Sequence, residues 1–418
     1  MPFNIAVSGL NAASADLNVI GNNVANASTT GFKASRAEFA DVYATSVFGT
    51  AAVATGGGVR VADVAQHFTQ GTVTFTNNNL DMAINGEGFF RLNDAGTIVY
   101  SRAGAFHADR DGYIINSGEQ RLTGYLADGN GTITGQLGDL RIDTSNISPA
   151  PTTQVDGALN LDANEVPPSV AWPAAPFAFG DPPPDLATYN SSTSLTVYDS
   201  LGNAHGMSMY FVKTGANSWD VHVLIDGVTA GATPAGTLQF LDDGSIDPAS
   251  AILNITGWNP LDANGNPSGA AAQDFDISLL SSTQYGSAFG VNALTQDGFT
   301  TGRLAGVDVD ATGVVFGRYT NGQLKALGQL VLANFANPQG LQPLGDTNWG
   351  ETFSSGQALL GAPATASLGV VQSGALEESN VELTQELVKM ILAQRNYQAN
   401  AQTIRTADAI TQTIINLR

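Results

Sequence analysis

Residues that could carry out catalytic or metal chemistry are few and widely spaced in this chain. The sequence holds four histidines, and none lies in an HExxH pattern or another close metal-ligand spacing: His67, His107, His205 and His222. It holds no cysteine, so a thiolate nucleophile and a cysteine-based zinc site are both excluded. We therefore expect no catalytic residue, no cofactor and no bound metal, and we expect that the protein is not an enzyme.

Two stretches resemble ligand or catalytic motifs but lack a required residue. The segment Asp262-Ala263-Asn264-Gly265-Asn266 resembles a calcium loop, yet Pro267 stands where a glycine is needed and Gln273 stands in place of the last carboxylate. In Gly286-Ser287-Ala288-Phe289-Gly290 the serine comes one position too early for a nucleophile elbow. No lysine follows a glycine, so a phosphate-binding GxxxxGK loop is absent. We interpret the calcium-like stretch as an ordinary turn.

The composition indicates a protein of several domains whose surfaces carry few charges. A chain of 418 residues is too long for one ordinary core, so two or three domains are expected. Only 13% of its residues are charged, about half of the roughly 25% that is usual, and 47 are glycine. The formal net charge of −21 argues against nucleic acid as a partner.

The start of the chain resembles no cleaved secretion signal. Met-Pro-Phe-Asn-Ile has neither a basic region nor a continuous apolar run, and nowhere do apolar residues approach the 18 in a row that a membrane span needs. We expect no membrane insertion, and a protein that stays in the cytoplasm or is exported without a cleaved signal peptide.

The residues from Gly374 to Arg418 predict a long helix. No glycine or proline follows Gly374. Apolar residues recur at spacings of three, four or seven, as they do on one face of a coiled-coil helix: Leu383, Leu387, Met390, Tyr397, Ala401 and Ile404. Ser379 to Glu382 reads as a capping box, so the helix is expected to start there.

The first residues of the chain predict a partner for that helix. Residues 3 to 24 repeat the same spacing with Phe3, Val7, Leu10, Leu17 and Val24. Both terminal stretches are nearly neutral, so they can lie together without repulsion. We predict that the two ends pair as a coiled coil. The alternative is that each helix packs on its nearest globular domain.

Between the ends, the chain predicts antiparallel β-structure. Short alternating stretches are separated by glycine-rich turns such as Asn85-Gly86, Asp111-Gly112 and Asp128-Gly129. The predicted fold is therefore mainly β with α-helical termini. Its expected parts are the terminal coiled coil (1–30 and 375–418), a linker region (31–70 and 364–374), a discontinuous first β domain (71–147 and 283–363) and an inserted outer β domain (148–282). The proline-rich residues 162–187 are predicted to form a rigid loop.

The two terminal stretches resemble signatures of the bacterial flagellar rod and hook protein family. The N-terminal match runs from Asn22-Asn23-Val24-Ala25-Asn26 to Thr30-Gly31-Phe32-Lys33. The C-terminal match holds Gly374 to Val381, Glu386-Leu387, Met390, Gln394-Arg395, Tyr397 and Asn400. Gln70-Gly71, Asp81, Ala83-Ile84, Gly86 and Gly88-Phe89-Phe90 resemble the shared β domain, and Thr193 to Gly202 resembles a stretch particular to hook proteins. Residues 162–187 match nothing in the family.

The resemblance implies a structural role in the flagellum. Rod proteins of this family are shorter, so the inserted domain favours a hook subunit that polymerises into a curved helical tube, the universal joint between rod and filament. The implied partners are copies of the chain itself, the distal rod protein, the hook cap, the hook–filament junction proteins and the flagellar type III export apparatus. Two alternatives remain: another axial subunit such as a distal rod protein, and an acidic β-rich surface adhesin.

The expected assembly residues lie in the two terminal stretches. They are the apolar stripe residues and the polar signature residues: Phe3, Val7, Leu10, Leu17, Asn22, Asn23, Asn26, Gly31, Phe32, Lys33, Leu383, Leu387, Met390, Gln394, Arg395, Tyr397 and Asn400. Each also has a local interpretation, as a helix cap, a turn or a contact within one subunit.

Overall fold

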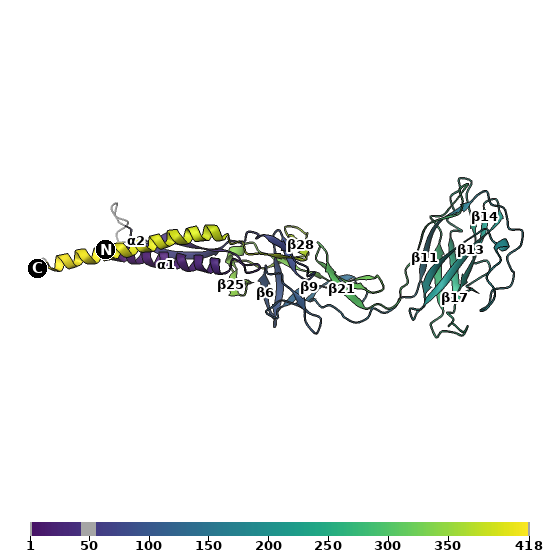
Figure 1. The fold of residues 1–418 in the computed structure, drawn as a ribbon, viewed down its shortest axis with the longest axis horizontal. Helices are drawn as coiled ribbons and strands as arrows, with labels where there is room; N and C mark the ends of the chain where they lie inside the picture. Colours follow the sequence, from purple (N-terminus) through teal and green to yellow (C-terminus); the bar gives the residue numbers. More distant parts are fainter. Residues whose placement is uncertain (1, 43–55, 417–418) are drawn as a thin grey trace. The chain divides into compact units, whose positions relative to one another are not determined.

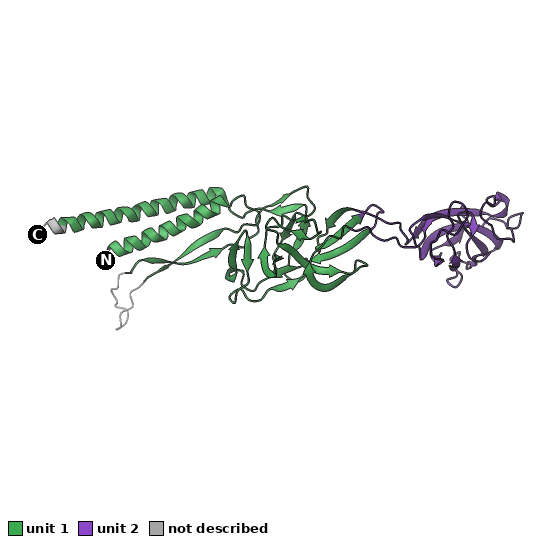
Figure 2. Cartoon of the chain, turned by 90° about the horizontal axis from the view of Figure 1, so that it is seen from below, with its two compact units in different colours: residues 1–144, 305–318, 324–418 green, residues 145–304, 319–323 purple. Residues whose placement is uncertain are grey.

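The computed structural model of the chain describes residues 2–42 and 56–416. Helix α1 (Pro2–Ala25) opens the chain and helix α2 (Leu383–Asn416) closes it, with β-strands between them (Figure 1). The predicted fold class is confirmed. The chain divides into two compact units, which are unit 1 (1–144, 305–318 and 324–418) and unit 2 (145–304 and 319–323) (Figure 2).

The two terminal helices pack against each other in opposite directions, which confirms the predicted pairing of the chain ends (Figure 1). Helix α2 begins at Leu383, later than the capping box predicted. The Glu386 amide donates to the Glu382 carbonyl (3.0 Å) at its start, and the Ser379 hydroxyl accepts from the Val381 amide (3.3 Å) before it. Within the described residues, neither helix is both long and apolar enough to cross a membrane.

The predicted linker 31–70 contains an ordered hairpin. Strands β1 (Ser35–Asp41) and β2 (Val59–Gln66) pair in antiparallel register, and the hairpin packs against α1, where the Ser8 hydroxyl accepts from the Val59 amide (3.2 Å) (Figure 2). Residues 43–55 of this predicted linker lie outside the described residues.

Unit 1 is built around one large, mostly antiparallel sheet whose strands come from both sides of the inserted segment. Its core gathers aromatic side chains, among them Phe89, Tyr100, Phe335 and Trp349. In spatial order the main path is β21 (Leu304–Val309), β22 (Val314–Tyr319), β23 (Leu324–Leu330), β9 (Arg121–Ala127), β5 (Phe89–Asp94), β6 (Thr97–Ser101), β26 (Asn348–Gly350) and β25 (Gln342–Gly345). Side branches are β7 (His107–Ala108), β8 (Ile114–Ile115), β10 (Ile133–Asp139), β24 (Leu332–Asn334) and β27 (Leu359–Gly361), and a short 3-10 helix spans Pro338–Gly340.

Two short strand pairs join the C-terminal segment to the start of the β region. Strand β28 (Val370–Ser373) pairs with β4 (Met82–Asn85), and β29 (Ala375–Glu377) pairs with β3 (Val73–Phe75). Residues 375–377 were predicted to belong to the terminal helix, and this prediction is wrong. The backbone there completes an antiparallel ladder, and the long helix starts only after it.

Unit 2 is a sandwich of two sheets with one apolar core. One sheet holds β17 (Ile252–Trp258), β18 (Gln273–Ser278), β11 (Gln154–Asp162), β19 (Thr283–Tyr285) and β20 (Gly290–Gln296). The other holds β12 (Ser191–Tyr198), β13 (Ala204–Gly215), β14 (Ser218–Ile225), β15 (Val228–Thr229) and β16 (Gly236–Gln239). Side chains from both sheets fill the core, with Trp219 and Phe211 fully buried.

The predicted boundary of the outer domain at residue 283 is wrong. Strands β19 and β20 both pair with β11, so they complete a sheet of unit 2 rather than the sheet of unit 1. The base of unit 2 lies further along, where isolated bridges join Ile147 to Gly302 and Ala150 to Phe299. The sequence did not predict this boundary, because the strands of both units show the same short alternating pattern.

Aspartates build a repeated hairpin turn in both units. In each turn the aspartate carboxylate accepts hydrogen bonds from the backbone amides two and four residues later, at 2.8 to 2.9 Å. The residue three positions after the aspartate is a glycine with φ between 77° and 87°. The aspartates are Asp109, Asp128, Asp199, Asp262 and Asp310. The calcium-like loop is one of these turns, and its hydrogen bonds from the Asn266 and Asn264 amides lower the pKa of Asp262.

The proline-rich residues 162–187 form an irregular segment that carries one short 3-10 helix (Leu186–Thr188) and lies on unit 2. Trp172 stacks on His222 of β14, with ring centroids 4.2 Å apart and an interplanar angle of 8°. The Phe177 amide donates to the Thr229 hydroxyl (2.8 Å), and the Lys213 ammonium donates to the Ala163 carbonyl (2.6 Å). Proline has no N–H to donate to a sheet ladder, and the segment is held by these contacts and by the Thr229 amide, which donates to the Phe177 carbonyl (3.1 Å).

Replacing Gly202 by alanine should destabilise unit 2 more than the same change at Gly227. Both glycines have φ +82°, so each alanine would lose about 1–2 kcal/mol to left-handed strain. At Gly202 the new Cβ would also lie 2.6 Å from Pro149, whereas Gly227 has no neighbour within 4 Å. Urea unfolding followed by tryptophan fluorescence measures both free energies. Equal losses would contradict this account.

The stability of unit 2 should fall as the pH drops from about 6.5 to 4. Burial lowers the pKa of His222 from 6.5 to about 4, although Asp220 opposes the shift. Between these values the unfolded chain binds the proton and the folded chain does not, so acid favours unfolding. We expect wild type to lose stability relative to His222→Phe across this window and to differ from it by a constant amount above pH 7. Urea midpoints at each pH test this, and a pH-independent difference would refute it.

Candidate assembly surfaces

The contact between α1 and α2 follows a seven-residue repeat. On α2 the buried or half-buried side chains alternate by four and three residues: Glu386, Met390, Ala393, Asn400, Ile404 and Ala407, with Tyr397 at the edge. On α1 the matching set is Ala6, Gly9, Ala13, Asp16, Ile20 and Asn23. Asn23 donates to the Glu386 carboxylate (3.2 Å), and Asn400 lies against Gly9, which fixes the antiparallel register.

Small and polar residues form much of this seam. Alanine and glycine allow the two helix backbones to approach closely, and the acidic groups meet within it. Burial and the Glu386 carboxylate raise the pKa of Asp16, and the Lys389 ammonium, which contacts Glu386 at 2.7 Å, opposes that rise. The seam therefore holds the pair together without using the largest apolar side chains.

The prediction that Leu383 and Leu387 line the seam is wrong. Leu383 is in phase with the seam but lies one turn beyond the end of α1, and Leu387 is one residue out of phase, so both are about half exposed (47% and 49%). Phe3 is likewise exposed (51%), near the free end of α1. Val7, Leu10 and Leu17 are half-buried, as a contact within the subunit requires.

The first three turns of α2 consequently present an exposed apolar face. It consists of large side chains that are each about half exposed: Leu383, Leu387, Val388, Ile391 and Leu392. Further along the helix the same side is polar, and the predicted assembly residues Gln394 and Arg395 are exposed there. We name these five residues the α2 apolar face.

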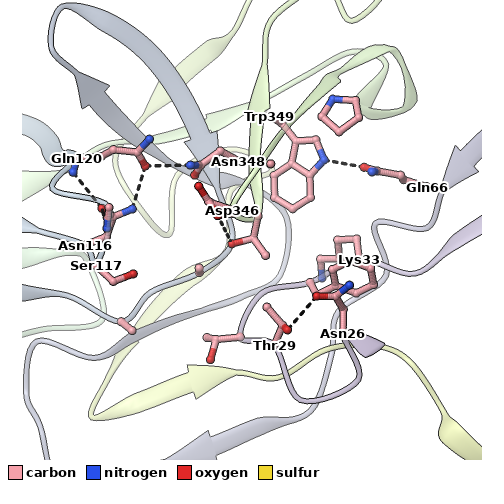
Figure 3. A pocket seen from close by; sticks show the side chains of 18 of the residues that line it. Asn26, Thr29, Lys33, Gln66, Asn116, Ser117, Gln120, Asp346, Asn348 and Trp349 are labelled. Carbon is pink, nitrogen blue, oxygen red and sulfur yellow. Dashed lines mark hydrogen bonds between the residues drawn. The ribbon is translucent and has the colours of Figure 1, made fainter. Parts of the chain in front are cut away.

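The three asparagines of the N-terminal signature have different environments. Asn26 donates to the Asn22 carbonyl (2.9 Å) at the end of α1, and both residues line a polar groove of about 920 Å³ in unit 1 (Figure 3). Phe32 lines the same groove. Asn23 is buried and holds the backbone of Ser35 through two hydrogen bonds of 2.7 and 2.9 Å.

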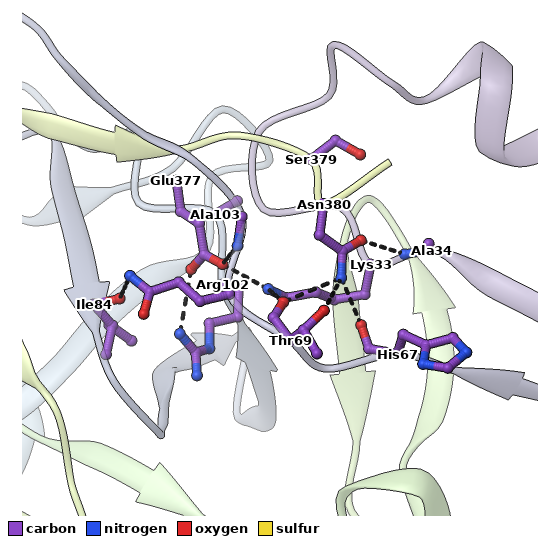
Figure 4. Close-up of polar contacts among 12 residues, drawn as sticks. Lys33, Ala34, His67, Thr69, Ile84, Arg102, Ala103, Glu377, Ser379 and Asn380 are labelled. Atoms are coloured by element: carbon purple, nitrogen blue, oxygen red, sulfur yellow. Dashed lines mark hydrogen bonds and ion pairs between the residues drawn. The ribbon is translucent and has the colours of Figure 1, made fainter. Parts of the chain in front are cut away.

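A buried charge cluster joins the two ends of the chain to the β region. The Lys33 ammonium contacts one Glu377 oxygen at 2.6 Å, and the Arg102 guanidinium contacts the other at 3.2 Å (Figure 4). The Lys33 and Glu377 side chains have no exposed surface. Burial lowers the pKa of Lys33, and the Glu377 carboxylate opposes this shift.

Backbone groups complete the hydrogen bonding around this charge cluster. Lys33 also donates to the Thr69 carbonyl (2.7 Å), Arg102 donates to the Gly86 carbonyl (2.9 Å), and the Gly71 amide donates to Glu377 (2.8 Å). The Arg102 Nε is buried without a partner among the described residues. The Glu377 carboxylate thus contacts both cations, and the negative charge of the exposed Glu87 also acts on Arg102.

Asn380 makes a second connection beside the charge cluster. Its side-chain oxygen accepts from the Ala34 amide (2.8 Å), and its side-chain nitrogen donates to the His67 carbonyl (2.8 Å) (Figure 4). The segment before α2 is therefore fixed to both ends of the β1–β2 hairpin. The residue three positions before α2 is thus held in place by its side chain.

The structure corrects the expectation that Asn23, Gly31 and Lys33 meet a neighbouring subunit. All three are buried inside the chain, because the N-terminal signature folds onto the C-terminal one. Sequence reasoning missed Glu377, Arg102 and Asn380 as their partners. Only the presence of Lys33 and Glu377 in the two signatures pointed to a link, since sequence spacing does not show which distant charges pair.

Removing the carboxylate from the charge cluster should destabilise unit 1 strongly. Glu377→Gln removes the carboxylate that contacts both buried cations, Lys33 and Arg102, which costs about 3–5 kcal/mol. Lys33→Met leaves a balanced Arg102–Glu377 pair and should cost less. The exposed neighbour Glu378 supplies the control, Glu378→Gln. Urea unfolding followed by circular dichroism gives the order, and a larger loss for Lys33→Met would contradict the charge argument.

Comparisons with known proteins place the same segments in flagellar families. Profiles match residues 3–33 (flagella basal body rod protein), 83–155 (flagellar hook protein FlgE/F/G D1 domain), 160–299 (flagellar basal body protein FlaE D2 domain) and 372–417 (flagellar basal body rod FlgEFG protein C-terminal). The inserted segment, including all of the proline-rich residues 162–187, thus matches a flagellar domain family, and the expectation that this stretch matches nothing in the family is wrong.

Full-length relatives agree with these profiles. The chain is 43% identical to the flagellar hook protein FlgE of Escherichia coli K12, with 100% of both chains covered. It is 34% identical to FlgE of Borreliella burgdorferi, with 99% of this chain and 98% of that one covered. The crystal structure of the Helicobacter pylori hook protein FlgE2 shares the fold, with a TM-score of 0.53 at 14% identity over 73% of this chain and 100% of that one. The resemblance predicted from the signatures is confirmed: the chain belongs to the flagellar hook protein family and is a structural subunit of the bacterial flagellar hook.

Proposed function

We propose that the subunit polymerises by burying the α2 apolar face against the terminal helices of neighbouring copies. The exposure of five large apolar side chains on an otherwise ordered helix carries this proposal. A contiguous apolar patch on an ordered surface is typical of an interface. Contacts of this kind repeat from subunit to subunit without closing, and so they build a helical tube.

The energies involved fit reversible assembly. Burial of apolar surface contributes about 25 cal/mol per Å², so covering one half-exposed leucine or isoleucine yields on the order of 1 kcal/mol. Five such side chains per subunit offset a useful part of the cost of association. No single contact is strong, which suits a tube that must bend.

The predicted assembly residues fall into two roles. Leu383, Leu387 and Phe3, with the exposed Gln394, Arg395 and Tyr397, would contact other subunits directly. The residues at the α1–α2 contact would act indirectly, by holding the helix pair in the shape that presents the face: Val7, Leu10, Leu17, Met390 and Asn400.

Unit 2 would serve as the outer, sliding part of the curved tube. Its residues 145–304 hold only two basic residues, Lys213 and Arg303, and Lys213 is buried. Acidic surfaces with few cations repel one another weakly at physiological salt and form no strong ion pairs between copies. Such surfaces could slide as the tube bends between rod and filament.

The remaining partners follow from this role. The distal rod protein would meet the first subunits, the hook cap and the junction proteins would meet the last, and the flagellar type III apparatus would export the chain to the cell exterior. Isolated helices are marginal in water, so α1 and α2 would be loosely held before they find neighbours, which suits an export-ready chain.

The substitution Ile391→Glu tests the proposal. It places a charge on the α2 apolar face and should leave the subunit folded, because Ile391 is half exposed and contributes little to the subunit core. We expect the critical concentration for polymerisation to rise at least tenfold, which corresponds to about 1.4 kcal/mol. Sedimentation of polymer and electron microscopy measure it.

Gln402→Glu is the matched control, since it adds the same charge at an exposed position further along α2. It should polymerise like wild type into curved tubes. An unchanged critical concentration for Ile391→Glu would show that the face does not drive assembly. Straight tubes from the wild-type chain would contradict the proposed curved joint.

A further inference from the structure

The outer side of α1 carries a line of asparagines. Asn11 lies two residues after Gly9 and two residues before Ala13, both of which belong to the contact with α2. Successive helix residues are turned by about 100°, so a separation of two residues places Asn11 on the side of α1 that faces away from α2. Asn4 and Asn18 lie seven residues before and after it, and all three are exposed. We name these three residues the α1 asparagine line.

No charged residue accompanies this line. Asp16 is the only charged residue among the 24 of α1, and it lies at the contact with α2. The exposed side of α2, in contrast, carries Arg395, Arg405 and Asp408. A helix side that faces water in the finished protein normally includes charged residues, as α2 does. The outer side of α1 therefore lacks the chemistry of a permanently solvated surface.

Asparagine is also a poor residue for the stability of an isolated helix. It is among the weaker helix formers, because its side chain competes for backbone hydrogen bonds, and alanine would serve better at an exposed position. Asn23 and Asn400 donate side-chain hydrogen bonds within the chain, whereas the side chains of Asn11 and Asn18 make none to the described residues. The line thus offers amide donors and acceptors that the subunit itself does not use.

We infer that the α1 asparagine line is a second subunit contact, which binds α2 of a neighbouring copy through amide hydrogen bonds. This contact rests on the proposed self-assembly but uses a surface separate from the α2 apolar face. An amide both donates and accepts, so a row of amides fits an uncharged polar helix side and needs no counter-charge. Phe3, which is exposed and is itself a proposed subunit contact, directly precedes Asn4 and extends the same surface.

The symmetry of an open helical polymer selects α2 as the partner. Copies in such a polymer point the same way and meet through different faces, since a face that met itself would need a twofold axis and would close a pair. The α1 asparagine line therefore does not bind the same line of a neighbour, and of the two terminal helices this leaves α2. Beyond its apolar face, the exposed side of α2 offers the amides of Gln394 and Gln398, one turn apart.

Alanine at two positions of the line separates assembly from folding. Asn11→Ala together with Asn18→Ala should leave the isolated subunit at least as stable in urea as wild type, because alanine is the better helix former. We expect the critical concentration for polymerisation to rise about tenfold, since two amide contacts are lost. Unchanged polymerisation would overturn the inference. A parallel loss of subunit stability would also overturn it, because the asparagines would then act in folding.

Two further variants serve as controls. Thr406→Ala, at an exposed position of α2, raises helix propensity in the same way and should polymerise like wild type. Ile391→Glu tests the α2 apolar face under the same conditions. If Ile391→Glu raises the critical concentration and the double alanine variant does not, only the α1 contact is refuted. If neither variant raises it, the proposed assembly through the α2 apolar face fails as well.

A label on the line identifies the partner. The chain has no cysteine, so Asn11→Cys provides one attachment point for a benzophenone. Labelled chains are assembled into an excess of nitrogen-15 wild-type chains and irradiated, and the cross-linked peptides are identified by mass spectrometry. Capture of a nitrogen-15 peptide from α2 supports the inference. Capture of another segment, of peptides from the labelled chain alone, or of no peptide at all overturns it.

Discussion

The position of Glu377 beneath two cations is the constraint on which unit 1 depends. Lys33 comes from the N-terminal signature, Arg102 from the β region and Glu377 from the strand before α2, and they meet with almost no solvent contact. A buried ion pair adds little net stability to a protein compared with apolar side chains of equal size. Removing one partner, however, destabilises the protein strongly, because the other charge stays buried. Folding of unit 1 therefore requires that the three segments reach their positions around the cluster together. The end of α1, the β1–β2 hairpin and the start of α2 lie close in the chain to its residues Lys33 and Glu377.

The packing of the helix pair is a compromise between close approach of the two helices and burial of apolar surface. The seam uses alanine, glycine, asparagine and a glutamate, which let the two helices lie close but bury little apolar area. The large side chains at the start of α2 remain outside. In the proposed assembly, neighbouring copies would cover these side chains, so the polymer would bury more apolar surface than the isolated subunit does.

Sequence patterns were sufficient for the fold class, the pairing of the ends and the family, because these depend on periodicity and on long motifs. They were insufficient where a shift of one residue along a helix decides which side chains face the partner helix. Leu387 and Met390 both fit an apolar stripe, and only the register set by Asn23 and Asn400 puts Met390 inside and Leu387 outside. The role of Lys33 was equally hidden, since a signature lysine looks the same in a sequence whether it is exposed or buried under Glu377.

The domain boundary shows a different limit. Strands β19 and β20 resemble any other short alternating strand, and their membership in unit 2 is fixed by pairing with β11 more than a hundred residues earlier. Long-range pairing of this kind leaves no local mark in the sequence. The aspartate turns are the opposite case, because each is encoded within five residues and recurs in both units.

The base of unit 2 has a consequence for how such chains can diverge. The segments that enter and leave the unit lie side by side, bridged at Ile147–Gly302 and Ala150–Phe299. An insertion whose two ends meet at one place can be enlarged, exchanged or removed while the host sheet keeps its strands. Unit 2 is therefore a replaceable module. Selection can change its size and surface while the charge cluster and the helix pair stay the same.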